Sequence, residues 1–306
     1  MANVSSTPPE SRQSPQPAAK IAIVTDSVAQ VPAERARQLG IRVVPSTIIV
    51  EGNKFLDGVD FNANGLYQRM RTEKNLVLST SAPSAGQFFA VFKECLEAGA
   101  DSVLYVGLSS RMSGTYSAAE GGAILAREEF GSRQITLFDT RIATIAQGFL
   151  AIEAAQLASQ GADLEHILGH LNEERKHIGL VASLETLEYL ARGGRIGKAA
   201  YMLGSAINIL PVVSFGDDGV VLPIQRVRGH HRALVEMVSY VSTQVAGCRS
   251  LKLAVMHADA LAQAEALQAM AVEALHPDEI FITHFTPVMA AHAGPGMIGL
   301  AYHWHP

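Results

Sequence analysis

The amino-acid sequence predicts an α/β protein in which short buried strands alternate with helices. Of its 306 residues, 48% are hydrophobic and 17% are charged, a balance typical of a well-packed globular chain. Short runs rich in β-branched residues recur along the chain, and segments of helical periodicity separate them. The first such run is KIAIVT, residues 20–25. A strand that is apolar on both faces indicates a parallel sheet covered by helices on either side.

The first half of the chain shows this alternation most clearly. Residues 1–19 are rich in Ser, Pro and Gln, and we expect them to form a disordered tail outside the fold. Gly40 should end the first helix, Pro45 should interrupt the second strand, and Ser84 with Gln87 should form a capping box. The expected strands are 20–25, 41–50, 101–108 and 134–139. The expected helices are 32–39, 62–71, 84–98, 114–129 and one ending near 157, with a hairpin at 51–58 and a hydroxyl-rich loop at 78–84.

The second half departs from strict alternation. An Asp-Gly turn at residues 216–219 predicts a β-hairpin between its flanking apolar runs. The expected helices are 164–177, 187–203, 231–245 and 260–275, and the expected strands are 179–183, 210–215, 220–225, 251–257, 279–284 and a final run ending near 302. From this change of pattern we predict two α/β domains, residues 20–170 and 171–306. The C-terminal segment is expected to complete a cleft that the two domains share.

The net charge and the cysteine content limit the classes of function that the sequence can be expected to have. The net charge of −5 gives no reason to expect nucleic acid as a partner. Cys95 and Cys248 lack a CxxC pattern, so we expect free thiols and no metal site. His303 and His305 lie close together, but two histidines this near a terminus rarely bind a metal on their own. No apolar run reaches the roughly 18–20 residues of a membrane span, and the first residues do not resemble a secretory signal. We therefore expect a cytoplasmic protein without stable membrane insertion.

Two hydroxyl-rich segments each precede a helix. They are STSAPS at residues 79–84 and SSRMSGT at residues 109–115. Ligands of α/β sheets bind at the carboxyl ends of strands, and a helix N-terminus offers free N–H groups and a positive dipole end. These segments are therefore expected to bind a carboxylate or phosphate. The alternative is that their hydroxyls only cap helices, which is their commonest role.

Two glycine-containing segments are further candidates. His292 precedes Gly-Pro-Gly at 294–296, where glycines let the backbone approach a ligand and a histidine can donate to an anion. A plain turn is an equal alternative there. Arg195 lies in a cationic segment, residues 192–198, that could contact phosphate, although the phosphate-loop spacing GxxxxGK[ST] is absent.

A hydrolase is a second function class to consider. Ser113 and His292 could act as nucleophile and base. However, the G-x-S-x-G elbow is absent because Met112 precedes Ser113, and no carboxylate is marked as the partner of His292. The sequence therefore disfavours hydrolysis.

Six short motifs of this sequence resemble the DegV family in order and spacing. They are TDS at 25–27, TSxPS at 80–84, SSxxSGTY at 109–116, GGRI at 193–196, VRG at 227–229 and HxGPG at 292–296. The resemblance runs from about residue 20 to residue 302. The sequence departs from the family pattern at Ala82, where Gln is frequent, and at Leu210, where Lys is common.

The resemblance implies two α/β domains with a long-chain fatty acid in a tunnel between them. It implies a lipid-binding carrier with no catalysis of its own and no cofactor besides the fatty acid. Some members present the acyl carboxylate to a separate ATP-dependent fatty-acid kinase, so we expect such a partner here. The ligand-binding residues that it implies are Thr80, Ser81, Ser110, Ser113 and His292, with Ser113 favoured over Ser110. Arg195 is expected to contact phosphate or the kinase. A self-sufficient acyl hydrolase or lipid phosphotransferase, or a lipid sensor, are the alternatives.

Overall fold

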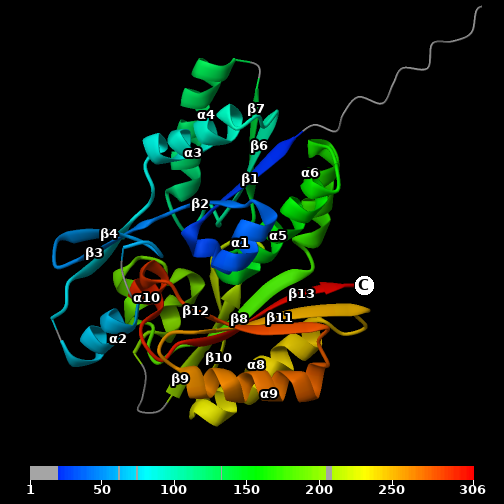
Figure 1. Cartoon of the computed structure of the whole chain (residues 1–306). Coiled ribbons are helices and arrows are strands. Elements are labelled where there is room, and N and C mark those ends of the chain that lie inside the picture. Colours follow the sequence, from blue (N-terminus) through cyan, green and yellow to red (C-terminus); the bar gives the residue numbers. More distant parts are fainter. Residues whose placement is uncertain (1–19, 61–62, 74, 132, 205–208) are drawn as a thin grey trace, which may run out of the picture.

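The computed structural model describes residues 20–60, 63–73, 75–131, 133–204 and 209–306. The predicted tail at residues 1–19 therefore lies outside the described residues. Within the described residues the strands form three sheets, and helices cover the two larger ones (Figure 1). The chain has the two α/β domains that the sequence predicts, although the limit placed at residue 170 stays a prediction.

The first domain is built on a four-stranded sheet whose strands are all parallel. In spatial order its strands are β2 (Arg42–Val44), β1 (Ile21–Asp26), β6 (Ser102–Gly107) and β7 (Gln134–Asp139). Its helices are α1 (Ala33–Leu39), α3 (Ala85–Glu97), α4 (Thr115–Phe130), α5 (Thr144–Ser159) and α6 (Leu164–Glu174). Successive strand residues face opposite sides: Ile23 packs in a core with α5 and α6, and Val24 packs in a core with α3 and α4.

The second domain is built on a six-stranded mixed sheet. In spatial order its strands are β10 (Val221–Arg228), β9 (Ile209–Phe215), β8 (Ile178–Ser183), β13 (Ile298–His305), β11 (Ser250–His257) and β12 (Glu279–His284). Helices α8 (His230–Gln244) and α9 (Leu261–Leu275) pack against one face of this sheet. The other face turns toward α5 of the first domain, and residues of both domains share that core. The C-terminal strand β13 pairs with β8 and β11, so the end of the chain lies in the middle of the sheet.

A small antiparallel sheet lies beside the junction of the domains. Its strands, in spatial order, are β4 (Asn53–Leu56), β3 (Thr47–Val50) and β5 (Leu78–Ser81). Helices α2 (Ala63–Thr72) and α10 (Pro287–Ala293) accompany it (Figure 1), and α7 (Glu188–Arg192), η1 (Ser27–Ala29) and η2 (Gly197–Met202) complete the described elements.

Several local predictions are confirmed. Ser84 and Gln87 form the capping box, with Gln87 N donating to Ser84 Oγ at 3.2 Å and Ser84 N donating to Gln87 Oε1 at 2.9 Å. Gly40 ends α1 with a φ of 67°, a conformation that favours glycine. Cys95 and Cys248 are both free.

Among the helices of the described part of the chain, none combines the length and the apolar character needed to cross a bilayer.

Two local predictions and one alternative interpretation, the turn at His292, are wrong. Residues 41–50 form two strands in different sheets, because Pro45 ends β2 and the chain leaves the four-stranded sheet before β3. Residues 78–81 form strand β5 and not a loop, because every residue of β5 pairs with β3. His292 lies in the last turn of helix α10 and not in a turn before the final strand. In the second and third cases tertiary pairing and packing outweigh local composition.

The close approach of α5 to η1 provides a test of the packing. A Cβ at Gly148 would clash with the carbonyl oxygen of Ala29 and lie 2.9 Å from Ile145 Cδ1. We expect Gly148→Ala to destabilise the protein by about 1–3 kcal/mol, although alanine favours a helix by up to about 1 kcal/mol. Urea unfolding followed by circular dichroism measures the change. Gly169→Ala on α6 is the matched control, because its Cβ would meet nothing within 4 Å and the substitution should be neutral or stabilising. Equal stability of the two variants would contradict this packing.

Candidate ligand-binding site

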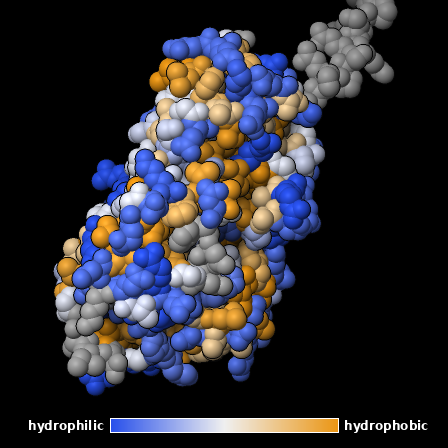
Figure 2. Space-filling model, turned by 60° about the vertical axis from the view of Figure 1, so that its left-hand side comes forward, coloured by the Kyte–Doolittle hydropathy of each residue, from blue (hydrophilic) through white to orange (hydrophobic). Residues whose placement is uncertain are grey.

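A pocket with an empty volume of about 930 Å³, including the part open to solvent, lies between the two domains. Its lining comes from segments far apart in the sequence, including β5, the loop after β6, β8, β9 and α10. On the face shown in Figure 2, hydrophobic surface is most continuous near the middle of the molecule, with hydrophilic surface on either side. The pocket therefore belongs to neither domain alone and depends on how the two pack.

The second domain supplies an apolar wall. On β8, Leu180 and Ala182 face the pocket, whereas Val181 between them packs under α8 and α9 on the far side of the sheet. This follows from the two-residue period of a strand. Further apolar lining residues are Leu184, Leu190, Val213, Phe215, Val221, Phe285, Val288, Met289 and Met297. Such a wall suits an apolar ligand, and its methionines can adapt to the ligand's shape.

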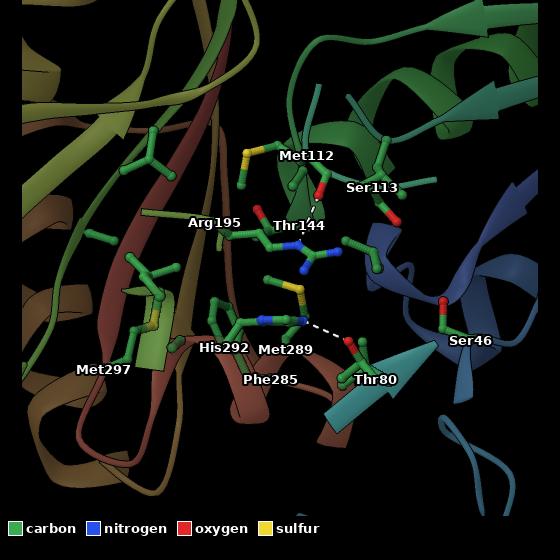
Figure 3. Close-up of a pocket in the computed structure, with 18 of the residues that line it drawn as sticks. Ser46, Thr80, Met112, Ser113, Thr144, Arg195, Phe285, Met289, His292 and Met297 are labelled. Atoms are coloured by element: carbon green, nitrogen blue, oxygen red, sulfur yellow. Dashed lines mark hydrogen bonds between the residues drawn. The ribbon is translucent and has the colours of Figure 1, made fainter. Parts of the chain in front are cut away.

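Polar side chains gather at another part of the pocket lining (Figure 3). Thr80 Oγ1 lies 2.8 Å from His292 Nε2, a hydrogen bond between β5 and α10. Arg195 Nε donates to the carbonyl oxygen of Met112 at 3.1 Å, and Arg195 Nη1 donates to that of Gly193. Ser81 and Ser113 line the same pocket. The structure thus brings together five of the six residues that the sequence singled out.

Burial, and to a smaller extent the positive charge of Arg195, lower the pKa of His292 to about 4. The imidazole is therefore neutral at neutral pH. Its Nδ1 is buried and has no hydrogen-bond partner within the described part of the chain. A Cβ at Gly193 would clash with this Nδ1, so the Gly-Gly segment makes room for His292.

The two serines of the second hydroxyl segment have different surroundings. Ser113 lines the pocket, and its Oγ lies 2.9 Å from Thr115 Oγ1 and accepts from Thr115 N at 3.2 Å. Ser110 lies on the exposed side, where its Oγ donates to Asp139 Oδ2 at 2.6 Å, and it is not among the described lining residues. Ser113 pairs with Thr115, and His292 pairs with Thr80. Among the described residues of this site, therefore, no serine is hydrogen-bonded to a histidine, as a nucleophile and its base would be.

Sequence reasoning missed other polar lining residues, among them Ser46 and Thr144. Thr144 begins α5 with a φ of 65°, which is unusual for a β-branched residue and is maintained here by burial. No motif signals either residue, because each stands alone among apolar or unrelated neighbours. Only the fold brings them to the pocket.

Together the fold and the site define a two-domain α/β protein with an apolar interdomain pocket that carries hydroxyls, an arginine and a neutral histidine. The family model described as an uncharacterised protein of the DegV family matches residues 20–304. This chain belongs to the DegV family, as its motifs predicted.

Relatives and solved structures agree with this assignment. A DegV domain-containing protein of Halalkalibacterium halodurans is 32% identical over 93% of this chain and 98% of the relative. A structure described as fatty acid binding of a DegV family protein from Thermus thermophilus has 31% identity and a TM-score of 0.86, covering 93% of this chain and 99% of its own. A protein from Thermotoga maritima, described as revealing a fatty acid binding function, has 26% identity and a TM-score of 0.81, covering 94% and 99%.

The lowered pKa of His292 predicts a pH dependence of stability. As pH falls, the unfolded chain, with an ordinary histidine pKa near 6.5, takes up the proton before the folded protein does. The free energy of unfolding of the ligand-free protein should therefore fall between about pH 6.5 and the folded pKa of about 4. The contribution of His292 is up to about 1.4 kcal/mol per pH unit.

Urea unfolding at a series of pH values measures this dependence. His292→Gln should make the slope shallower but not zero, because burial also lowers the pKa of His257 to about 4. Gly169→Ala should keep the wild-type slope, since it changes no titratable group. An unaltered slope in His292→Gln would contradict the assignment.

Proposed function

We propose that this chain binds a long-chain fatty acid, with the carboxylate at the polar cluster and the acyl chain along the apolar wall. The observation that carries the proposal is the combination of one cationic, hydroxyl-bearing cluster with an otherwise largely apolar interdomain pocket. The relatives from Thermus thermophilus and Thermotoga maritima, both described as binding fatty acid, support it.

Arg195 is proposed as the main carboxylate ligand. Two carbonyl oxygens hold its Nε and Nη1, which orients the guanidinium, and its Nη2 has no hydrogen-bond partner in the described ranges. A hydrogen bond from an arginine to a carboxylate is charge-assisted and stronger than one from a hydroxyl. We therefore assign Arg195 to the head group of the ligand, instead of the contact with phosphate or a kinase that the family resemblance implies.

Thr80, Ser113 and His292 are proposed to complete the head-group site. In the tautomer where neutral His292 donates from Nε2 to Thr80 Oγ1, the threonine hydroxyl hydrogen is free to donate to the carboxylate. Ser81 and Ser113 line the pocket and offer further hydroxyls, and Ser113 is preferred to Ser110 because Ser110 is bound to Asp139. This arrangement fixes the orientation of the acyl group, which is what a carrier needs.

The acyl chain supplies most of the affinity in this proposal. Each buried methylene contributes about 0.8 kcal/mol, so a long chain gains several kcal/mol even after the cost of ordering it. The wall formed by β8 and β9 is apolar and buried, as such binding requires.

The binding prediction concerns Arg195→Gln. Loss of a charge-assisted hydrogen bond costs about 1.5–3 kcal/mol, so fatty-acid affinity should fall about 10- to 100-fold. Native mass spectrometry should first show one fatty acid per chain, and displacement of a fluorescent fatty acid from the delipidated protein gives the affinities. Arg192→Gln is the matched control, because Arg192 is an exposed arginine three residues away whose partner is Glu188.

Two outcomes would count against the proposal. A wild-type chain that binds no fatty acid would overturn the function, and wild-type affinity in Arg195→Gln would overturn the head-group assignment.

The same displacement assay compares the two serines. Ser113→Ala should weaken fatty-acid binding more than Ser110→Ala does. The reverse order would assign the carboxylate contact to Ser110 instead of Ser113.

We further infer that the chain presents the bound carboxylate to a separate ATP-dependent fatty-acid kinase. Ser81 lines the pocket and is exposed, so the head group would lie near the surface, within reach of a second protein. The sequence has no phosphate-binding loop of the GxxxxGK[ST] type, which supports an external source of nucleotide binding. The absence of a serine–histidine hydrogen bond among the described site residues disfavours the hydrolase alternative.

A coupled assay tests this inference. The loaded chain, a purified fatty-acid kinase and ATP should together give acyl phosphate, trapped by hydroxylamine as the hydroxamate. The loaded chain with ATP alone should give none. Product formed without the kinase would identify the chain as a phosphotransferase, and no product with the kinase would refute the partnership.

A further inference from the structure

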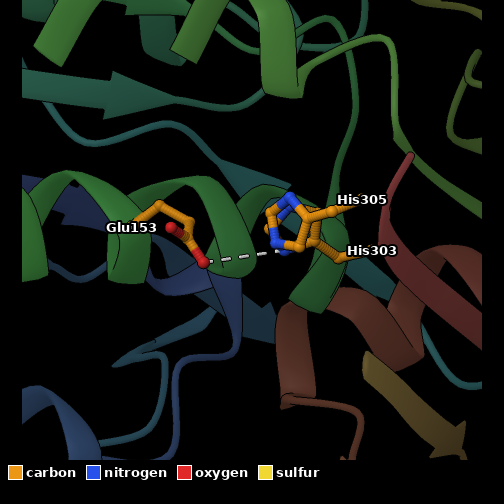
Figure 4. Close-up of side chains that lie close together, drawn as sticks. All are labelled: Glu153, His303 and His305. Carbon is orange, nitrogen blue, oxygen red and sulfur yellow. Dashed lines mark ion pairs between the residues drawn. The ribbon is translucent and has the colours of Figure 1, made fainter. Parts of the chain in front are cut away.

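A second polar cluster lies between the two domains, where helices α5 and α6 meet strand β13. Glu153 of α5 and His303 and His305 of β13 each offer a possible metal-ligand atom, and these atoms all lie within 4.8 Å of one another. Figure 4 shows the Glu153 carboxylate facing the two imidazole rings. None of the three residues lines the fatty-acid pocket proposed above.

His303 is the best-defined member of this cluster. Its side chain is 0% exposed, and its Nε2 lies 2.6 Å from Glu174 Oε2. Its Nδ1 is buried without a hydrogen-bond partner among the residues that the structure describes, and lies 3.8 Å from Glu153 Oε1. With the ring proton on Nε2, the lone pair of Nδ1 faces a carboxylate, an arrangement that a cation between them would relieve.

The surroundings supply the outer hydrogen bonds that a metal site usually has. Glu174 Oε2 contacts His303 Nε2 and also lies 3.2 Å from His305 Nδ1. A carboxylate that accepts from the outer nitrogen of a metal-binding histidine fixes its tautomer and orientation. His170 Nε2, also buried and unpartnered within the described ranges, lies 3.5 Å from Glu153 Oε2. Two unpartnered imidazole nitrogens thus converge on Glu153.

The ammonium group of Lys252 would compete with a metal ion for the Glu153 carboxylate. Its Nζ lies 2.9 Å from Glu153 Oε1 and already balances one negative charge. The Lys252 side chain is 27% exposed, so it can turn toward solvent when a divalent ion takes its place.

We propose that Glu153, His303 and His305 bind a divalent transition-metal ion, best matched by Zn²⁺, which joins α5 of the first domain to β13 of the second. Imidazole nitrogen and carboxylate oxygen are common zinc ligands, at about 2.0–2.2 Å, and Mg²⁺ instead prefers oxygen ligands. In a tetrahedral site the ligand atoms lie about 3.4 Å apart, so small side-chain rotations suffice to close this set. Water or His170 completes the coordination.

This site revises the expectation of no metal, which considered only the pair of histidines. On a strand, His303 and His305 lie on the same face, while Trp304 between them packs on the opposite side against the core under α8 and α9. The third ligand comes from position 153, on a different domain. No sequence spacing reveals it.

Isothermal titration of the metal-stripped, tag-free full chain with zinc chloride tests the proposal. We expect one saturable site, with no comparable binding of magnesium chloride. Glu174→Gln should weaken zinc binding about 10- to 100-fold by removing the outer carboxylate, and His305→Ala should weaken it by at least about 100-fold. His166→Ala, an exposed histidine on α6, is the matched control and should bind as the wild type does.

Two further measurements distinguish the loss of a metal ligand from the loss of the fold. His305 has a side chain that is 33% exposed, so its substitution should leave the fold intact by circular dichroism. Zinc should raise the melting temperature of the wild type and of His166→Ala but not of His305→Ala. Absence of a saturable zinc site in the wild type, or wild-type zinc affinity in both His305→Ala and Glu153→Gln, would overturn the proposal. Fatty-acid binding is measured separately and does not decide it.

Discussion

The burial of helix α5 between the two sheets is the constraint on which the rest of the structure depends. The helix is apolar around nearly its whole circumference, so it must be enclosed on all sides. Leu150 and Ala154 pack toward the four-stranded sheet, and Ile145 and Phe149 pack toward the six-stranded sheet. Its buried Gln147 donates to Asp26 Oδ2 at 2.9 Å, which ties the helix to the end of β1. Helix α5 therefore belongs to the cores on both sides, and its packing against the six-stranded sheet helps to set the position of the pocket between the domains.

The polar cluster of the pocket contains a single charge, which bears on the carboxylate site proposed for it. Burial keeps His292 neutral, so Arg195 is the one cation among the described lining residues. A second buried positive charge would have to be desolvated without a partner whenever the site is empty, at a cost of several kcal/mol. Hydroxyls carry a smaller cost of this kind because they can bond one another, as Ser113 and Thr115 do. A single charge therefore limits the free-energy cost of leaving the pocket empty.

Features of the fold that depend on neighbouring residues can be predicted from the sequence. Features that depend on contacts between distant segments cannot. The capping box at Ser84 and the glycine stop at Gly40 were predictable because each depends on a few neighbouring residues. The strand β5 was mistaken for a loop because its hydroxyl side chains resemble loop residues and its partner strand β3 lies some thirty residues earlier. The motifs identified Thr80, Ser113 and His292 but not their mutual arrangement. The expected contact of Arg195 with phosphate or a kinase stays a prediction, and the orientation of its side chain toward the carbonyl oxygen of Met112, far away in sequence, could not be inferred from its motif.

Helix α5 also links the two proposed ligand sites physically. Thr144, at its first residue, lines the pocket, and Glu153 lies nine residues on, about 13–14 Å along the helix axis. A fatty acid would contact both domains at one end of this helix, and a metal ion would join the same two domains further along it. Each ligand would therefore favour the same packing of α5 between the sheets. Because such coupling is reciprocal, a metal ion that raises the affinity for the fatty acid would itself bind more tightly, by the same factor, to the loaded protein.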